Sequence, residues 1–247
     1  MEVQGPSYAE YAIQNTYGIK TINDTVYDFM KYAYNVPGTG CADAIGYCRE
    51  TNYTTAAEKA VCAEASYACR DAYEGMLCLN NININRLTRS QGIWFAYTTR
   101  GSYDIRTSVS QAVPPTKYAR AYLNSAHVQS ALGVSLNWTA TNYEVYDLFD
   151  NAGDYVYPFA LQSINRLLNR GIRVLLYYGD ADFNCNWFGG EAVSLAANWT
   201  HADKFASAGY ADFTIKNQTY GAVRQYGNFA FLRLYESGHQ VPYFQRK

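Results

Sequence analysis

The stretch Ile172-Arg173-Val174-Leu175-Leu176-Tyr177-Tyr178, followed at once by Gly179-Asp180-Ala181-Asp182, decides the fold. Its apolar residues do not alternate strictly, which is typical of a strand covered on both faces in a parallel sheet. Before it, Phe159 to Arg170 carries apolar residues at helical spacing, and Gly171 stands where a helix C-terminal cap is expected. The pattern predicts a helix that leads into a buried strand.

A second strand of the same character is predicted from Phe229 to Tyr235, after a helical region from Gly190 to Trp199. Helix, buried strand, loop, helix and buried strand together form the unit of an α/β protein. In such sheets ligands and catalytic groups collect beyond the carboxyl ends of the strands. The acid loop, Gly179 to Trp187, and the histidine loop, Glu236 to Pro242, follow the two predicted strands. We therefore expect the chemistry of this chain in these two loops.

An acidic loop followed by a histidine loop matches the order of the last two members of the Ser, Asp, His triad of α/β hydrolases. In that triad the histidine takes a proton from a serine hydroxyl, and the aspartate stabilises the imidazolium that forms. Asp180 or Asp182 as a turn former or helix cap, with His239 as an ordinary loop residue, remains the alternative. Gly238 permits a close approach of the histidine loop and favours the hydrolase site.

The pattern is irregular up to about residue 100 and becomes regular from Tyr103 onward. Residues 1 to about 100 are predicted to be helical and loop-rich, and a core-facing helix is predicted after Pro114-Pro115-Thr116, reaching about Leu132. The chain has 247 residues, 49% of them hydrophobic and 17% charged, which suffices for a globular core. Its formal net charge of −1 argues against nucleic acid or an anionic membrane as a partner. No apolar run is long enough to predict a transmembrane helix, and no signal peptide is visible.

Cysteine usage and glycosylation sequons nevertheless point to the secretory route. No cysteine belongs to a C-x-x-C pair, which disfavours zinc and favours a local disulfide cluster. The clustered cysteines are Cys41, Cys48, Cys62, Cys69 and Cys78, and the N-x-[ST] asparagines are Asn23, Asn52, Asn137, Asn198 and Asn217. Together they predict a secreted or vacuolar/lysosomal protein. A secreted chain without an export signal leads us to expect that its N-terminal portion is absent here.

Two segments carry a family resemblance. Tyr178 to Gly189, with its Gly-Asp-Ala-Asp-Phe-Asn-Cys-Asn-Trp core, and Ser237-Gly238-His239-Gln240-Val241-Pro242 resemble the aspartate and histidine signatures of the serine carboxypeptidases, of the carboxypeptidase Y-like, fungal type. Weaker similarity runs through Gln14 to Gly18, Tyr103 to Arg106 and Tyr122 to Val134. The resemblance covers nearly the whole chain but only the later half or so of a family member.

The resemblance implies the fold and its division. It implies an α/β-hydrolase fold whose N-terminal part is absent. Residues 1–100 are then a helical, cysteine-rich insertion, and residues 101–247 are the C-terminal part of the core.

The resemblance also implies roles for single residues. Asp182 becomes the triad aspartate and His239 the triad base, whereas Asp180 becomes structural. Cys185 matches a position near the pocket for the residue before the scissile bond, although a small buried hydrophobe is an equal alternative. Gln240 matches a position near the pocket for the departing C-terminal residue. Among the five clustered cysteines, one is left without a local partner.

A triad also needs a serine on a strand-to-helix elbow, normally G-x-S-x-G. The nearest match, Gly5-Pro6-Ser7-Tyr8-Ala9, has too few residues before it to form the strand that feeds the elbow. We therefore expect Ser7 not to be catalytic and the chain to lack its nucleophile. Cys185 shares a loop with the acid and is a still poorer candidate.

The sequence thus predicts a serine-type carboxypeptidase that releases C-terminal residues from peptides or proteins through an acyl-enzyme, without metal or cofactor, in a chain that is inactive alone. A non-catalytic secreted pseudoenzyme or binding glycoprotein on the same scaffold is the alternative. An esterase on the same fold is a third, weaker one.

Overall fold

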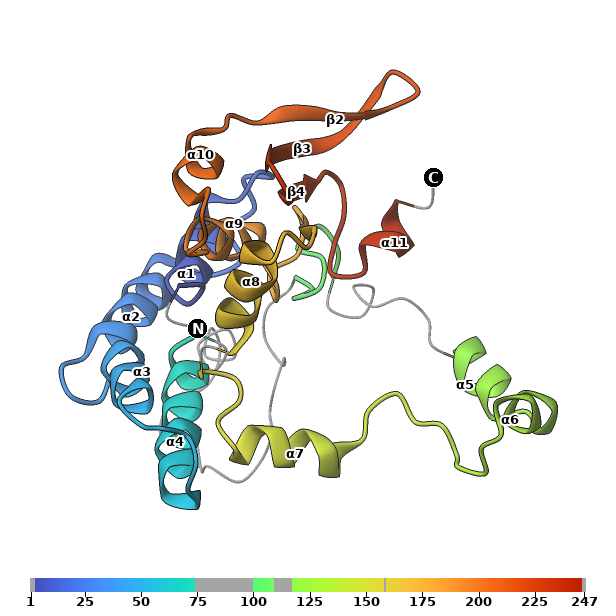
Figure 1. The fold of residues 1–247 in the computed structure, drawn as a ribbon, viewed down its shortest axis with the longest axis horizontal. Coiled ribbons are helices and arrows are strands. Elements are labelled where there is room, and N and C mark those ends of the chain that lie inside the picture. The colour runs from blue at the N-terminus through green and yellow to red at the C-terminus, as the bar shows by residue number, and fades with distance from the viewer. Residues whose placement is uncertain (1–2, 74–99, 109–116, 158, 246–247) are drawn as a thin grey trace.

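The computed structural model describes residues 3–73, 100–108, 117–157 and 159–245 (Figure 1). The helices are α1 (Ser7–Gln14), α2 (Asp24–Asn35), α3 (Cys41–Arg49), α4 (Ala56–Tyr73), α5 (Lys117–Leu123), α6 (Ala126–Leu132), α7 (Tyr143–Asn151), α8 (Phe159–Asn169), α9 (Trp187–Leu195), α10 (Ala202–Ser207) and α11 (Val241–Phe244). The strands are β1 (Val174–Gly179), β2 (Ala211–Ile215), β3 (Gln218–Tyr226) and β4 (Phe229–Leu234). None of these helices is long and apolar enough to cross a membrane.

The strands form one mixed sheet in the order β1-β4-β3-β2. The two predicted strands, β1 and β4, are parallel neighbours, and Gly179 pairs with Leu234 at their carboxyl ends. Strand β3 runs antiparallel to both β4 and β2. The parallel pair confirms the predicted α/β unit, and its register brings the acid loop and the histidine loop to the same edge of the sheet.

The helices α8, α9 and α10 pack on the sheet. Beneath them Phe229 and Phe231 are buried with Leu168, Trp199 and Phe205. The helix predicted before the first strand is confirmed as α8, and Gly171 has the positive φ of 74° that a C-terminal cap requires. The aromatic cluster fixes the strands against the helices.

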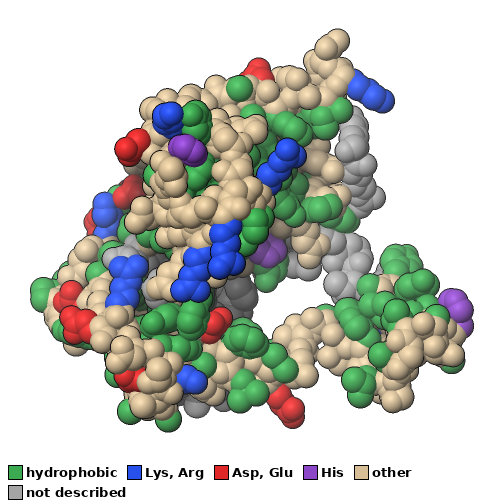
Figure 2. All heavy atoms as spheres, in the orientation of Figure 1, with side chains coloured by type: hydrophobic (Ala, Val, Ile, Leu, Met, Phe, Trp, Pro, Cys, Tyr) green, Lys and Arg blue, Asp and Glu red, His purple; other side chains and the backbone are tan. Residues whose placement is uncertain are grey.

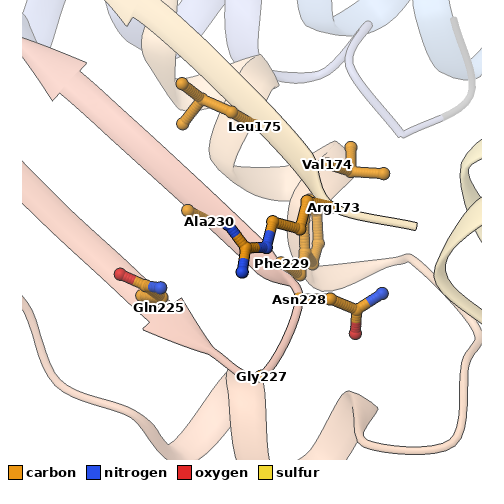
Figure 3. Close-up of a pocket in the computed structure, with 8 residues that line it drawn as sticks. All are labelled: Arg173, Val174, Leu175, Gln225, Gly227, Asn228, Phe229 and Ala230. Carbon is orange, nitrogen blue, oxygen red and sulfur yellow. The ribbon is translucent and has the colours of Figure 1, made fainter. Parts of the chain in front are cut away.

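The opposite face of β1 differs from the prediction. Leu175 is 54% exposed and Tyr177 is 51% exposed, so this strand is not covered on both faces in the structure. The cause is the alternation of side chains along the strand, because α8 and α9 bury only the residues that point toward them. Figure 3 shows Leu175 lining a pocket with Ala230 of β4 and Gln225 of β3.

Helices α3 and α4 form an antiparallel pair joined by two disulfides, Cys41–Cys69 and Cys48–Cys62. The predicted cluster is thereby confirmed for four of its cysteines. Cys78 lies outside the described residues. Cys185 is a free thiol.

One buried cluster joins the beginning of the chain to the acid loop. Tyr8 and Tyr11 of α1 are buried with Ala181 and Phe183, and the cluster continues into α2, α3 and α4. The predicted boundary near residue 100 adjoins residues outside the described ranges, so the division into an insertion and a core stays a prediction.

The helix predicted up to Leu132 is two helices, α5 and α6, interrupted at Asn124 and Ser125. The Asn124 side chain accepts a hydrogen bond from the backbone of Trp138 at 2.6 Å and donates one to its carbonyl at 3.0 Å. The expectation of a core-facing helix is wrong, because Ala126 and Ala131 are exposed and Leu132 is 62% exposed. Figure 2 shows hydrophobic side chains on the outer surface of α5 and α6, which lie apart from the sheet in Figure 1.

Candidate active site

The acid loop leaves β1 at Gly179, where a side chain would collide with the histidine loop. A Cβ there would lie 2.3 Å from the Ser237 carbonyl oxygen. Two residues further on, the N–H of Ala181 donates to that same carbonyl at 2.8 Å. Glycine thus allows the two loops to pair beyond the ends of their strands.

The loop around residues 100–107 supports both site loops. The Ser102 carbonyl accepts hydrogen bonds from the N–H groups of Phe183 and Asn184, both at 3.0 Å. The Tyr103 carbonyl accepts one from the His239 N–H at 2.8 Å. The Tyr103 ring also lies 4.6 Å from the His239 ring, centre to centre. His239 is therefore held through its backbone and along one face of its imidazole.

Asp182 and His239 meet where these loops converge. Asp182 Oδ2 and His239 Nδ1 lie 2.8 Å apart, and the Asp182 side chain is 3% exposed against 33% for His239. The carboxylate is thus almost buried, and the imidazole faces partly outward. A carboxylate on Nδ1 fixes the orientation of the ring and leaves Nε2 for a reacting group.

Electrostatics follow from this contact. The hydrogen bond to Asp182, supported by one to the Cys185 thiol, raises the pKa of His239 to about 10, although burial acts in the opposite direction. Burial raises the pKa of Asp182, and its hydrogen bond to His239 opposes that rise. The pair is therefore built to stabilise an imidazolium.

The other predicted site residues take different positions. Cys185 is half-buried, and its Sγ lies within 4.8 Å of the ligand atoms of Asp182 and His239, so it joins the pair. Gln240 is exposed at the N-terminus of α11, where its carbonyl accepts the Tyr243 N–H. The Ser7 hydroxyl donates to the Gln4 carbonyl at 2.6 Å and to Asn186 Oδ1 at 3.1 Å. Ser7 begins α1 with no strand before it among the residues described.

Asp180 is buried to the same extent as Asp182, and it contacts α1 and the segment after it. Its side chain accepts a hydrogen bond from the Tyr17 hydroxyl at 2.6 Å, and its carbonyl accepts one from the Tyr11 hydroxyl at 2.7 Å. Burial raises the pKa of Asp180. The sequence did not single out either tyrosine as a contact of Asp180. Tyr17 lies within the weakly similar segment Gln14 to Gly18, and Tyr11 lies just before it.

The donor set also bears on metal binding. The ligand atoms of Asp182, Cys185 and His239 all lie within 4.8 Å of one another. Two ligands on one tetrahedral zinc, each about 2 Å from the ion, would be about 3.3 Å apart. The 2.8 Å between Asp182 and His239 fits a shared proton better.

The sequon asparagines do not contribute to this site. All five lie on the surface, and the Asn23 side chain caps α2 by accepting the Val26 N–H at 2.8 Å. Asn217 lies in the turn between β2 and β3. Surface position is what a glycan acceptor requires.

A parallel strand pair that places a buried aspartate on Nδ1 of a histidine, at adjacent carboxyl ends, has the geometry of an α/β hydrolase. A family model described as serine carboxypeptidase matches residues 3–247, and the chain therefore belongs to the serine carboxypeptidase family.

Curated relatives share this assignment. Carboxypeptidase S1 homolog B of Arthroderma otae is 39% identical over 98% of this chain and 36% of its own length. Carboxypeptidase Y of Komagataella phaffii is 32% identical over 74% of this chain and 35% of its own length. The chain thus spans about a third of the length of these relatives.

A solved structure supports the fold. The structure of Kex1Δp, a prohormone-processing carboxypeptidase of Saccharomyces cerevisiae, superimposes with a TM-score of 0.62 at 18% identity, over 98% of this chain and 49% of that one. The α/β-hydrolase fold expected from the sequence is thereby confirmed.

Proposed function

We propose that Asp182 and His239 are the acid and base of a serine-type carboxypeptidase that releases C-terminal residues from peptides or proteins. The observation that carries this proposal is the 2.8 Å contact between a buried carboxylate and His239 Nδ1. Its support is that the pair lies at adjacent strand ends in a chain of this family. In this role His239 takes the proton of a serine hydroxyl as an acyl-enzyme forms, and Asp182 stabilises the imidazolium.

We further propose that the nucleophilic serine lies outside these 247 residues. The Ser7 hydroxyl is engaged by Gln4 and Asn186, and the buried Ser237 hydroxyl donates to the Tyr235 carbonyl at 3.1 Å. Within the part of the chain that the structure describes, no serine is hydrogen-bonded to His239. The nucleophile then belongs to the part of the family fold that the longer relatives carry.

The disulfides and the sequons bear on where the protein is located. Two disulfides and five exposed sequons support a protein that is secreted or enters the vacuole or lysosome. The proposed partners are peptide and protein C-termini rather than nucleic acid or membrane. Cys185 and Gln240 are proposed to line the substrate pockets.

Labelling with a fluorophosphonate, which bonds covalently to an activated serine, tests where the nucleophile lies. The two samples are this chain and a chimera in which it replaces the matching 36% of Carboxypeptidase S1 homolog B. We expect no label within the 247 residues in either sample, and label on a serine of the relative's part of the chimera. The S7A variant should label like its parent, whereas label on any serine of these residues would place the nucleophile inside the chain.

A non-catalytic protein on the same scaffold remains the second candidate, favoured by the engagement of Ser7 in structural hydrogen bonds. An unlabelled chimera that is folded would support it. An esterase would label, and would hydrolyse esters but release no C-terminal amino acid from a peptide.

A further inference from the structure

The Tyr17 side chain contacts both loops that carry the acid–base pair. Its hydroxyl donates a hydrogen bond to Asp180 Oδ1 at 2.6 Å and accepts one from the backbone N–H of Glu236 at 3.1 Å. Asp180 precedes Asp182 by two residues. Glu236 precedes His239 by three. One hydroxyl therefore connects the acid loop to the histidine loop.

The turn after α1 holds Tyr17 in place. Asn15 is buried, and its Oδ1 accepts hydrogen bonds from the N–H groups of Tyr17 at 3.1 Å and Ile19 at 3.2 Å. Gly18 completes the turn with a φ of 62°, a conformation that glycine adopts without strain. The Arg106 guanidinium lies 5.4 Å from the centre of the Tyr17 ring. The hydroxyl is thus presented from a fixed turn.

On the histidine loop, the bond to Tyr17 holds a strained residue. Glu236 has a φ of 51°, in the left-handed region that residues other than glycine rarely adopt. Such a conformation persists only where surrounding contacts enforce it. The Tyr17 hydroxyl is the acceptor for the Glu236 N–H. Loss of this acceptor would let Glu236 relax toward an ordinary backbone conformation. The backbone between Glu236 and His239 would then change its course and shift the imidazole.

On the acid loop, the bond ends on a buried carboxyl group. Asp180 is 2% exposed, and its Oδ2 lies 3.4 Å from Arg233 Nη2. The Arg233 guanidinium itself packs 3.9 Å from the centre of a Trp187 ring. Hydrogen bonds to a charged acceptor are stronger than neutral ones, so the Tyr17–Asp180 bond is a firm attachment.

We propose that Tyr17 is a positioning residue for the acid–base pair, because its hydroxyl ties the two loops together and so sets the approach of Asp182 to His239. This inference rests on the proposed function for its meaning. The geometry concerns residues of this chain alone and can be measured without substrate.

The test measures how fast the proton that lies between Asp182 and His239 exchanges with water in the Y17F variant. We expect this proton to give a low-field ¹H NMR signal that is absent in H239Q. We expect Y17F to raise its exchange rate with water by about tenfold or more, since one hydrogen bond to a charged group is lost. Y27F is the matched control: Tyr27 is half-buried and donates to Glu10 Oε1 at 2.8 Å, away from both loops. Its exchange rate should equal that of the parent.

An exchange rate in folded Y17F equal to that in Y27F would overturn the proposal. If Y17F does not fold, the comparison is made in the E236G background, because glycine adopts the positive φ of residue 236 without strain. There Y17F/E236G should exchange faster than E236G, and equal rates would overturn the proposal. Since no hydrolysis is measured, a failure here is distinct from a failure of the chimera to act as a carboxypeptidase.

Discussion

At the residue scale, the site depends on a proton shared between Asp182 and His239. The contact raises the pKa of His239 from 6.5 to about 10, so the folded chain stabilises the imidazolium more than the unfolded chain does. Its contribution to stability is fully present below pH 6.5 and is lost as the pH rises through about 10. The same stabilisation of the imidazolium serves a base that receives a proton from a hydroxyl.

Substitution of the two partners should separate their effects on the His239 pKa. We expect D182N to lower this pKa strongly, and C185A to lower it less, because Asp182 is the larger of the two causes. An NMR titration of the imidazole C–H signals of His239 measures the two effects. The His201 signals are the internal control, because His201 is exposed and contacts neither Asp182 nor Cys185. A larger effect of C185A than of D182N would show that the thiol dominates.

Single residues differ in how far the sequence predicts them. Asp182 and His239 were predictable because each follows a recognisable strand, and parallel strand ends share one edge of a sheet. Tyr17 was not, because its two partners are 163 and 219 residues away in the chain. The packing of α1 against α9 and against the acid loop brings this segment to the two loops.

At the element scale, the disulfides hold the α3–α4 pair together. They close segments with sequence separations of 28 and 14 residues. Closing such segments limits the unfolded chain more than the folded one, so each bond stabilises the fold.

Removal of either disulfide should cost about 3–4 kcal/mol in the free energy of unfolding. The variants are C41S/C69S and C48S/C62S, and denaturant unfolding measures the difference from the parent. C185S, which removes a free thiol, should change the free energy by no more than about 0.5 kcal/mol. Disulfide variants as stable as C185S would show that the helices pack without help from these bonds.

The helices and strands that the sequence predicted are those with long, continuous apolar patterns. Helix α8 and strands β1 and β4 follow from continuous apolar patterns. The β2–β3 hairpin was not predicted, because its turn uses Lys216 and Asn217 at positive φ in place of the usual Asn-Gly. The break between α5 and α6 depends on the bonds of Asn124 to Trp138, which a local pattern does not reveal.

At the scale of the whole molecule, the α/β-hydrolase fold and the family were predictable from two short motifs at the right strand ends. The exposed face of β1 was not, since an unbroken apolar strand predicts cover on both faces, and Leu175 and Tyr177 are about half exposed. The chain also spans only 36% of the length of Carboxypeptidase S1 homolog B. Activity therefore has to be measured in a context that supplies the rest of that fold.

The most direct measurement is the rate at which the chimera with Carboxypeptidase S1 homolog B releases the C-terminal amino acid from an N-blocked dipeptide. We predict release, with kcat lowered about 10⁴-fold by D182N and to a similar or greater extent by H239Q. The controls H201Q and D212N, which change exposed residues away from the site, should keep the parent rate. A folded chimera that hydrolyses equally fast with D182N or H239Q, or that releases no amino acid at all, would contradict the assignment of Asp182 and His239 as the acid and base of a carboxypeptidase.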